Sequence, residues 1–177
     1  VKDRKNQRRQ AVIFDLDGTL ANTLDDLADC CNWAISHFDV EPISRERYRY
    51  LVGQGVRYLL EHALGPDKAQ HTDEAVKLHM SRYAEHMYDK SGPYPGVPAM
   101  LDELTRRGVK RAVLSNKPDT ATRQMVSRMF SGWNFDAVWG NREGYEPKPD
   151  PESARTLIRS INLLPEQVIY VGDTRVD

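Results

Sequence analysis

Two carboxylates stand one residue apart near the start of the chain, directly before a glycine. The apolar stretch 11–14 leads into Asp15-Leu16-Asp17-Gly18. Side chains alternate along a strand, but where the chain leaves the strand and turns at Gly18, both acids can face a ligand above the sheet, which is where open α/β sheets bind ligands. On its own, the pair fits a strand-end acid beside an Asp-Gly turn equally well. Polar groups elsewhere in the chain must therefore decide between a ligand site and a plain turn.

Three further polar groups stand where predicted elements begin or end. They are Ser115-Asn116-Lys117-Pro118, Glu146-Pro147-Lys148-Pro149-Asp150-Pro151 and Gly172-Asp173-Thr174-Arg175-Val176-Asp177. The first and the last follow predicted strands, and parallel strands bring such ends to one edge of a sheet. Lys148 stands between two prolines, which restrict its backbone and so help to fix its ammonium group. We therefore expect these groups to meet the two acids at one edge.

Such an edge would combine clustered carboxylates, an ammonium group, a hydroxyl and backbone N–H groups. Carboxylates this close raise one another's pKa unless a divalent cation lies among them. An all-oxygen site that shares its coordination shell with phosphate and water suits Mg²⁺. The cation and Lys148 would together supply the positive field that a phosphoryl group requires. The residues therefore predict a magnesium site that handles a phosphoryl group.

The residues that follow the first strand have helical periodicity. The predicted helices cover 24–38, 56–64 and 72–87. Asn22 or Thr23 is the expected N-cap of the first helix, and the Pro- and Gly-rich stretch 91–96 breaks the helical run. No part of this region predicts a strand. We refer to residues 22–91 as the helical insert.

Beyond the helical insert, helices and strands alternate. The predicted helices are 97–107, 119–130 and 151–161, and the predicted strands are 109–115, 135–139 and 168–172. Alternation of this kind implies parallel strands with right-handed crossovers. We therefore expect a discontinuous α/β core, formed by residues 1–21 and 92–177, with the helical insert placed after its first strand.

The composition excludes several classes of protein. The 177 residues carry a net charge of −1, which argues against a nucleic-acid-binding surface, and the basic tail 1–9 is expected to be solvated. No apolar run approaches the roughly 18 residues that span a bilayer. The adjacent Cys30 and Cys31 cannot form a redox or zinc pair, and the five histidines have no zinc spacing. A reduced, cytoplasmic setting without nucleic-acid or membrane partners fits best.

The polar groups together resemble a known pattern. Asp15-Leu16-Asp17-Gly18-Thr19, Ser115-Asn116, Lys148-Pro149 and Gly172-Asp173-Thr174-x-x-Asp177 are similar, in this order, to the four motifs of the haloacid dehalogenase superfamily. The helical insert resembles the helical cap of that superfamily, and Ser115-Asn116-Lys117-Pro118 and Gly172-Asp173-Thr174 resemble its phosphoglycolate phosphatase subfamily. The resemblance spans nearly the whole chain and implies an α/β core with a Rossmann-like parallel sheet.

The resemblance also implies roles for the motif residues. Asp15 would attack phosphorus and form an aspartyl-phosphate, while Asp17 would protonate the leaving alkoxide and then deprotonate the attacking water. The implied phosphate-binding residues are Gly18, Thr19, Ser115, Asn116 and Lys148, the last of which also counts as catalytic. The implied magnesium ligands are Asp15, Asp17 through its backbone carbonyl, Asp173 and Asp177.

The implied function is magnesium-dependent hydrolysis of a small phosphate monoester, with 2-phosphoglycolate as the preferred substrate. The carboxylic acid at Asp17 favours a phosphatase over a dehalogenase, which lacks an acid at that position. Pyrophosphatase, nucleotidase and sugar phosphomutase remain alternatives within the superfamily. A protein of the same fold that binds phosphate or a partner without turnover is the alternative from a different class.

Two further expectations concern the helical insert and the end of the chain. Gly53-Gln54-Gly55-Val56-Arg57 opens a predicted helix, and because related caps place such a loop over the site, Gln54 and Arg57 are candidate contacts for the part of the substrate other than phosphate. The family pattern continues beyond Asp177 with another helix and strand, so we expect a natural extension of roughly 40 residues. Monomer and homodimer both remain open.

Overall fold

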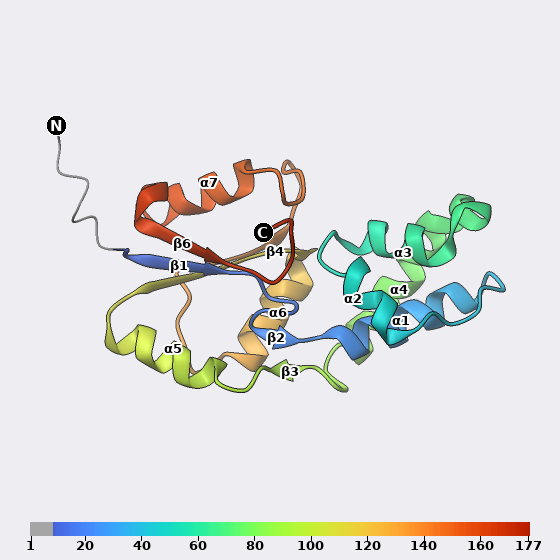
Figure 1. The fold of residues 1–177 in the computed structure, drawn as a ribbon, viewed down its shortest axis with the longest axis horizontal. Coiled ribbons are helices and arrows are strands. Elements are labelled where there is room, and N and C mark those ends of the chain that lie inside the picture. The colour runs from blue at the N-terminus through green and yellow to red at the C-terminus, as the bar shows by residue number, and fades with distance from the viewer. Residues whose placement is uncertain (1–8) are drawn as a thin grey trace.

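The computed structural model describes residues 9–177. The prediction of a solvated basic tail therefore lies, for residues 1–8, outside the described residues. Four parallel strands form the main sheet in the order β5-β4-β1-β6 (Figure 1). Their bounds are Ala11–Phe14 for β1, Lys110–Pro118 for β4, Ala137–Asn141 for β5 and Val168–Val171 for β6. The parallel α/β core predicted from the alternation of elements is confirmed.

Helices cover both faces of this sheet. Helices α5 (Val97–Arg106) and α6 (Asp119–Met129) lie on one face and α7 (Glu152–Ser160) lies on the other (Figure 1). Neighbouring residues of each strand alternate between the two faces. Phe14 and Val113 belong to the core that includes residues of α5 and α6, whereas Ile13 and Leu114 pack with Leu157 of α7. Strand β1 is central, so the residues that follow it emerge at the middle of the sheet edge.

The helical insert forms a separate helical body beyond the carboxyl ends of the strands (Figure 1). It contains α1 (Leu24–Ser36), α2 (Arg45–Leu51), α3 (Val56–Leu64), the 3₁₀ helix η2 (Pro66–His71) and α4 (Thr72–His86). Its own core includes Ile35, Tyr48 and Leu60. The short antiparallel strands β2 (Ala21–Asn22) and β3 (Gly92–Pro93) pair where the chain enters and leaves it.

Helix α2 was not expected from the sequence. It buries only Tyr48 and Leu51, which is too few apolar positions to produce a helical repeat. Strand β5 begins two residues later than the predicted strand 135–139. Phe135 instead packs edge-on against Phe130, with ring centroids 6.3 Å apart. Packing contacts thus explain why α2 forms without a hydrophobic repeat and why β5 begins later than its sequence pattern predicts.

Strand β6 lies at one edge of the sheet and follows the 3₁₀ helix η3 (Pro165–Gln167). Ile169 and Val171 of this strand are exposed. Across residues 9–177, none of the helices has both the length and the apolar character needed to cross a membrane. Phe14, at the end of β1, pairs with Val113 of β4 and with Val171 at the end of β6. Because β4 continues to Pro118, the motif 115–118 lies in the last part of this strand, beside the residues that follow β1 and β6.

Candidate active site

The turn after β1 begins with the buried Asp15 and bends at Gly18. Asp15 is 2% exposed, and its Oδ1 accepts a hydrogen bond of 2.7 Å from the backbone N–H of Leu16. Gly18 has a φ of +83°, and a Cβ atom on it would lie 2.2 Å from a carboxylate oxygen of Asp173. Glycine is needed here both for its backbone conformation and for the close approach of the loop after β6.

Lys148 occupies the centre of the core side of the site. Its Nζ atom lies 3.2 Å from Asp15 Oδ1 and 2.5 Å from Asp177 Oδ1. It also donates to the Tyr170 hydroxyl at 2.9 Å and to the Leu114 carbonyl at 3.2 Å. Burial alone would lower the pKa of Lys148, but Asp15 and the other partners outweigh burial and hold the pKa above its ordinary value. Lys148 is therefore a fixed cation beside the Asp15 carboxylate.

Three carboxylates of the site could hold a metal ion. Asp15, Asp173 and Asp177 each offer an oxygen, and these oxygens all lie within 4.8 Å of one another. Burial raises the pKa of Asp15 to about 6 despite the opposing effect of Lys148, and burial also raises the pKa of Asp173. Hard carboxylate oxygens are the ligands that Mg²⁺ prefers, so the donor set fits this ion.

Thr19 and the loop after β6 support this cluster. The Thr19 hydroxyl donates to Asp173 Oδ1 at 3.2 Å. Asp177 Oδ2 accepts from the backbone N–H of Thr174 at 2.9 Å and from its hydroxyl at 2.8 Å. Burial would raise the pKa of Asp177, but Lys148 outweighs it and the pKa lies below its ordinary value. Thr19 thus contacts a proposed metal ligand, and its predicted contact with phosphate stays a prediction.

The Asp17 side chain is not part of the three-carboxylate cluster. Its Oδ1 accepts a hydrogen bond of 2.7 Å from the Thr23 hydroxyl. Thr23, the residue before α1, makes no side-chain cap for that helix, because its hydroxyl is committed to Asp17. The two acids of the Asp-x-Asp pair therefore serve different sides of the site. The predicted use of the Asp17 backbone carbonyl as a metal ligand stays a prediction.

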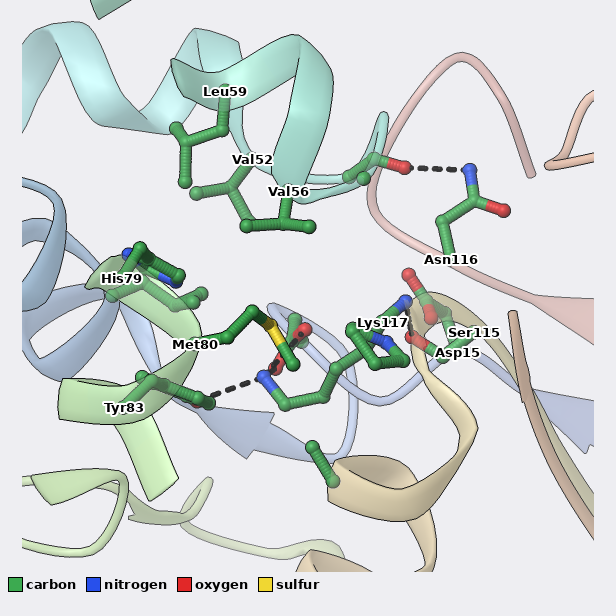
Figure 2. A pocket seen from close by; sticks show the side chains of 16 residues that line it. Asp15, Val52, Val56, Leu59, His79, Met80, Tyr83, Ser115, Asn116 and Lys117 are labelled. Atoms are coloured by element: carbon green, nitrogen blue, oxygen red, sulfur yellow. Dashed lines mark hydrogen bonds and ion pairs between the residues drawn. The ribbon is translucent and has the colours of Figure 1, made fainter. Parts of the chain in front are cut away.

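The role of Lys117 was not predicted from the sequence, although this residue stands in the motif Ser115-Asn116-Lys117-Pro118. Its side chain is 2% exposed, and its Nζ lies 3.1 Å and 3.2 Å from the two Asp17 carboxylate oxygens. It also donates to the hydroxyl of Tyr83, on α4, at 2.7 Å (Figure 2). Burial alone would lower the pKa of Lys117, but Asp17 and Tyr83 reverse this and raise it. The sequence carries no local signal for a contact that joins the core to the helical insert.

Asn116 links three segments through its side chain. Its amide nitrogen donates to the Gly53 carbonyl at 2.8 Å and to the Lys148 carbonyl at 3.0 Å. Its amide oxygen accepts from the Lys148 N–H at 2.7 Å. Ser115 is 4% exposed beside it, and its hydroxyl oxygen accepts from the Lys117 N–H at 3.3 Å. The Asn116 side chain thus positions Lys148, while phosphate binding by Ser115 and by the Asn116 N–H stays a prediction.

A cavity of about 40 Å³ lies between the core and the helical insert (Figure 2). The core contributes Asp15, Asp17, Ser115, Asn116, Lys117, Pro118 and Ala121, and the insert contributes Leu27, Val52, Gly53, Gly55, Val56, Leu59, His79, Met80 and Tyr83. The insert side is mostly apolar, whereas the core side carries the charged groups. The cavity thus joins the nucleophile candidate Asp15 to an apolar wall.

The structure does not bring Gln54 and Arg57 to this cavity. Arg57 is 61% exposed and forms ion pairs with Glu61 and Asp73 on the outside of the insert. The loop itself reaches the cavity through Gly53 and Gly55 instead. The expected substrate contacts of Gln54 and Arg57 receive no support from this arrangement and stay predictions.

His79 is a histidine of the helical insert that lines the cavity. It is 1% exposed, lines the cavity and stacks on Tyr83 with ring centroids 5.5 Å apart. Burial and, to a lesser extent, the nearby Lys117 lower the pKa of His79 to about 4. His79 is therefore a neutral wall residue near neutral pH. Its apolar surroundings, and not its sequence spacing, determine this behaviour.

Comparison with known proteins identifies the same family as the motifs. A model for haloacid dehalogenase-like hydrolases matches residues 12–177. Phosphoglycolate phosphatase 1 of Pseudomonas aeruginosa is 31% identical over 172 residues, and phosphoglycolate phosphatase of Pseudomonas putida is 33% identical over 172 residues. Each alignment covers 94% of this chain and 63% of the relative. The chain thus spans less than two thirds of the length of these two proteins.

Solved structures share the fold. A predicted phosphoglycolate phosphatase from Haemophilus somnus superimposes with a TM-score of 0.81 and 27% sequence identity, over 96% of this chain and 78% of that chain. The agreement includes the helical insert as well as the sheet, since so little of this chain is left out. From its match to the family model and its architecture, the chain belongs to the haloacid dehalogenase-like hydrolases.

Proposed function

We propose that this protein is a magnesium-dependent phosphatase that hydrolyses a small phosphate monoester, with 2-phosphoglycolate as the preferred substrate. One observation carries the proposal: Asp15 is buried between a fixed cation, Lys148, and two further carboxylates that can share a metal ion. The names of the Pseudomonas relatives support the choice of substrate class. The partner of this protein is then a small phosphorylated metabolite.

In the first half of the reaction, an Asp15 carboxylate oxygen attacks phosphorus and the bond from phosphorus to the ester oxygen breaks. The leaving alkoxide takes a proton from the Asp17 carboxyl group, so that the alcohol departs neutral at that oxygen. Because burial raises the pKa of Asp15 only to about 6, this group is mostly ionised and nucleophilic near neutral pH. Lys148 lies 3.2 Å from Asp15 and stabilises the negative charge on the phosphoryl oxygens as the new bond forms.

In the second half, water attacks the phosphorus of the aspartyl-phosphate. Asp17 takes the proton of this water, and the bond between phosphorus and Asp15 breaks to release inorganic phosphate. Both enzyme groups then return to their starting protonation states. Two easier displacements thereby replace one difficult hydrolysis.

Asp15, Asp173 and Asp177 would hold the magnesium ion, with the Asp17 carbonyl as the proposed fourth protein ligand. When bound, this ion neutralises negative charge on the phosphoryl group and on the clustered carboxylates. Gly18 maintains the close approach of the two loops that carry these ligands, because a side chain there would overlap Asp173.

The cavity supports a small leaving group. Its volume is about 40 Å³ and its insert side is formed largely by apolar side chains. A two- or three-carbon alcohol is a better match than the leaving group of a nucleotidase.

The decisive experiment compares the wild type with Asp15→Asn. We expect the wild type to release inorganic phosphate from 2-phosphoglycolate only with magnesium, and the variant to lose this activity because its amide cannot attack phosphorus. Asp29→Asn makes the same chemical change at a 60% exposed site and should leave the activity intact. Pyrophosphate, a nucleoside monophosphate and glucose 1-phosphate complete the panel.

Two results would overturn the proposal. One is the absence of magnesium-dependent phosphate release from every ester in the panel, which would favour a protein that binds phosphate without turnover. The other is full activity of Asp15→Asn, which would exclude an aspartyl-phosphate on Asp15. Faster turnover of another ester would correct only the preferred substrate.

A further inference from the structure

The site holds a second buried lysine that phosphoryl transfer does not require. Lys148 already places a cation beside Asp15, and the three-carboxylate cluster can hold a metal ion. Among the described residues, the ion-pair partner of Lys117 is Asp17 and not Asp15. A buried ammonium group is costly unless it is paired. We therefore expect Lys117 to have a role other than contact with the phosphoryl group.

Lys117 lies on the side of the site where the leaving group must sit. Its carboxylate partner, Asp17, is the group proposed to protonate the leaving oxygen. Its other partner, the Tyr83 hydroxyl, belongs to the helical insert. Among the described residues that line the cavity, Lys117 is the only lysine or arginine. A substrate in this cavity would thus meet one buried cation beyond the phosphoryl group.

Both Asp17 oxygens already accept hydrogen bonds on the side where Asp17 is proposed to act on the leaving group. One oxygen accepts from both Thr23 and Lys117, and the other accepts from Lys117. When an Asp17 oxygen turns to the leaving oxygen, Lys117 loses part of its pairing. The low-dielectric surroundings then favour a new anionic partner for the ammonium group.

We propose that Lys117 binds a carboxylate carried by the leaving group of the substrate, in exchange for part of its contact with Asp17. Lys117 thereby selects phosphate esters of small hydroxy acids over esters of neutral alcohols. The inference rests on the proposed phosphatase function and assigns the selection of its substrate to this residue. The apolar side chains Val56, Leu59 and Met80 would surround the short carbon chain between the two anionic ends.

The test compares two esters that differ in one group. 2-Phosphoglycolate carries a carboxylate where 2-hydroxyethyl phosphate carries a neutral CH₂OH group. We expect the wild type to prefer the first ester, and Lys117→Met to lower kcat/KM for it about 100-fold, because a buried charge pair is lost. The loss for 2-hydroxyethyl phosphate should be at least about tenfold smaller, because this ester makes no such pair.

Matched variants separate substrate selection from a structural role. Lys117→Gln keeps a hydrogen-bonding side chain without the charge and should lose the preference even where Lys117→Met fails to fold. Lys117→Arg keeps the charge and should restore part of the preference. Lys90→Met removes a lysine that is 55% exposed and should leave the ratio of the two kcat/KM values unchanged.

The outcomes distinguish the inference from the function on which it rests. Equal losses for both esters in the Lys117→Met and Lys117→Gln variants would overturn the inference, because they indicate that Lys117 only positions Asp17. A wild type that hydrolyses both esters equally well would also overturn it while leaving the phosphatase proposal standing. Failure of the wild type to hydrolyse any ester with magnesium would instead overturn the proposed function.

Discussion

Lys148 and Lys117 are both buried lysines at the same sheet edge, but they belong to different parts of the molecule. Every hydrogen-bonding partner of the Lys148 ammonium group comes from the α/β core, including Tyr170 on β6. Lys117 instead bridges Asp17 of the core and Tyr83 of the helical insert. The core thus fixes the cation nearest the proposed nucleophile, Asp15, whereas the surroundings of Lys117 depend on the insert.

The difference between the two lysines separates the residues proposed for phosphoryl transfer from the residue proposed to select the substrate. Asp15, Lys148 and the other two acids of the three-carboxylate cluster, which are proposed to act on the phosphoryl group or to hold the metal ion, all belong to the α/β core. The surroundings of Lys117 and the apolar cavity wall are linked instead through the insert, because Tyr83 and Met80 both lie on α4. Movement of such an insert is a common means of admitting and enclosing substrate.

Removal of the core cation should have the largest effect. Lys148→Met leaves Asp15 and Asp177 without their shared ammonium group. We expect activity with magnesium to fall by about 100- to 1,000-fold and the free energy of unfolding to fall by about 3–5 kcal/mol, since a buried ion pair is broken. Steady-state kinetics and urea denaturation measure the two effects.

Lys148→Met also tests the division between the two lysines. The variant should slow hydrolysis of 2-phosphoglycolate and of 2-hydroxyethyl phosphate by similar factors, unlike Lys117→Met. A large change in the preference between these esters would show that Lys148 also contacts the leaving group. It would contradict the proposed division of roles between the two lysines.

The pH dependence of protein stability should report on His79, on the insert side of the cavity. His79 has a pKa of about 4 in the folded protein, below the ordinary value of about 6.5 for histidine. Between these values the unfolded chain binds a proton that the folded protein does not, so stability falls as the pH is lowered through this range. The difference corresponds to about 3 kcal/mol.

His79→Phe should remove this contribution, as measured by urea denaturation at several pH values between about 4 and 6.5. Asp15 acts in the opposite direction because its raised pKa lowers stability as the pH rises toward about 6, so only the difference between variant and wild type isolates His79. His62→Phe, at an exposed position, should retain the wild-type dependence. An unchanged curve for His79→Phe would mean that His79 is protonated equally in both states.

The smallest effect is expected at the outer surface of the insert. Arg57→Ala removes exposed ion pairs with Glu61 and Asp73, and such pairs contribute little, about 0–1 kcal/mol. Because Arg57 does not line the cavity, the ratio of kcat/KM values for the two esters should stay unchanged. A clear change in that ratio would revive the expectation that Arg57 contacts the substrate and would extend the selecting surface beyond Lys117.

The sequence was most informative where one short segment contains both an element and its functional group. The apolar stretch before Asp15 becomes β1, and Gly18 adopts the positive φ that its turn needs. The last residues of β4 and those that follow β6 could be expected near Asp15 because parallel strands place their carboxyl ends at one edge. Helix α2 was less predictable, since its stability depends on packing of Tyr48 and Leu51 within the insert.

The sequence by itself determined the parallel core, the helical insert and the motif residues at the sheet edge, because hydrophobic periodicity and strand ends are local properties. Only the tertiary structure decided which side each acid faces and which partner each lysine receives. Asp17 is separated from Lys117 by 100 residues, and Lys117 from Tyr83 by 34. No local pattern encodes contacts across such distances, since they arise only when the insert packs against the folded sheet.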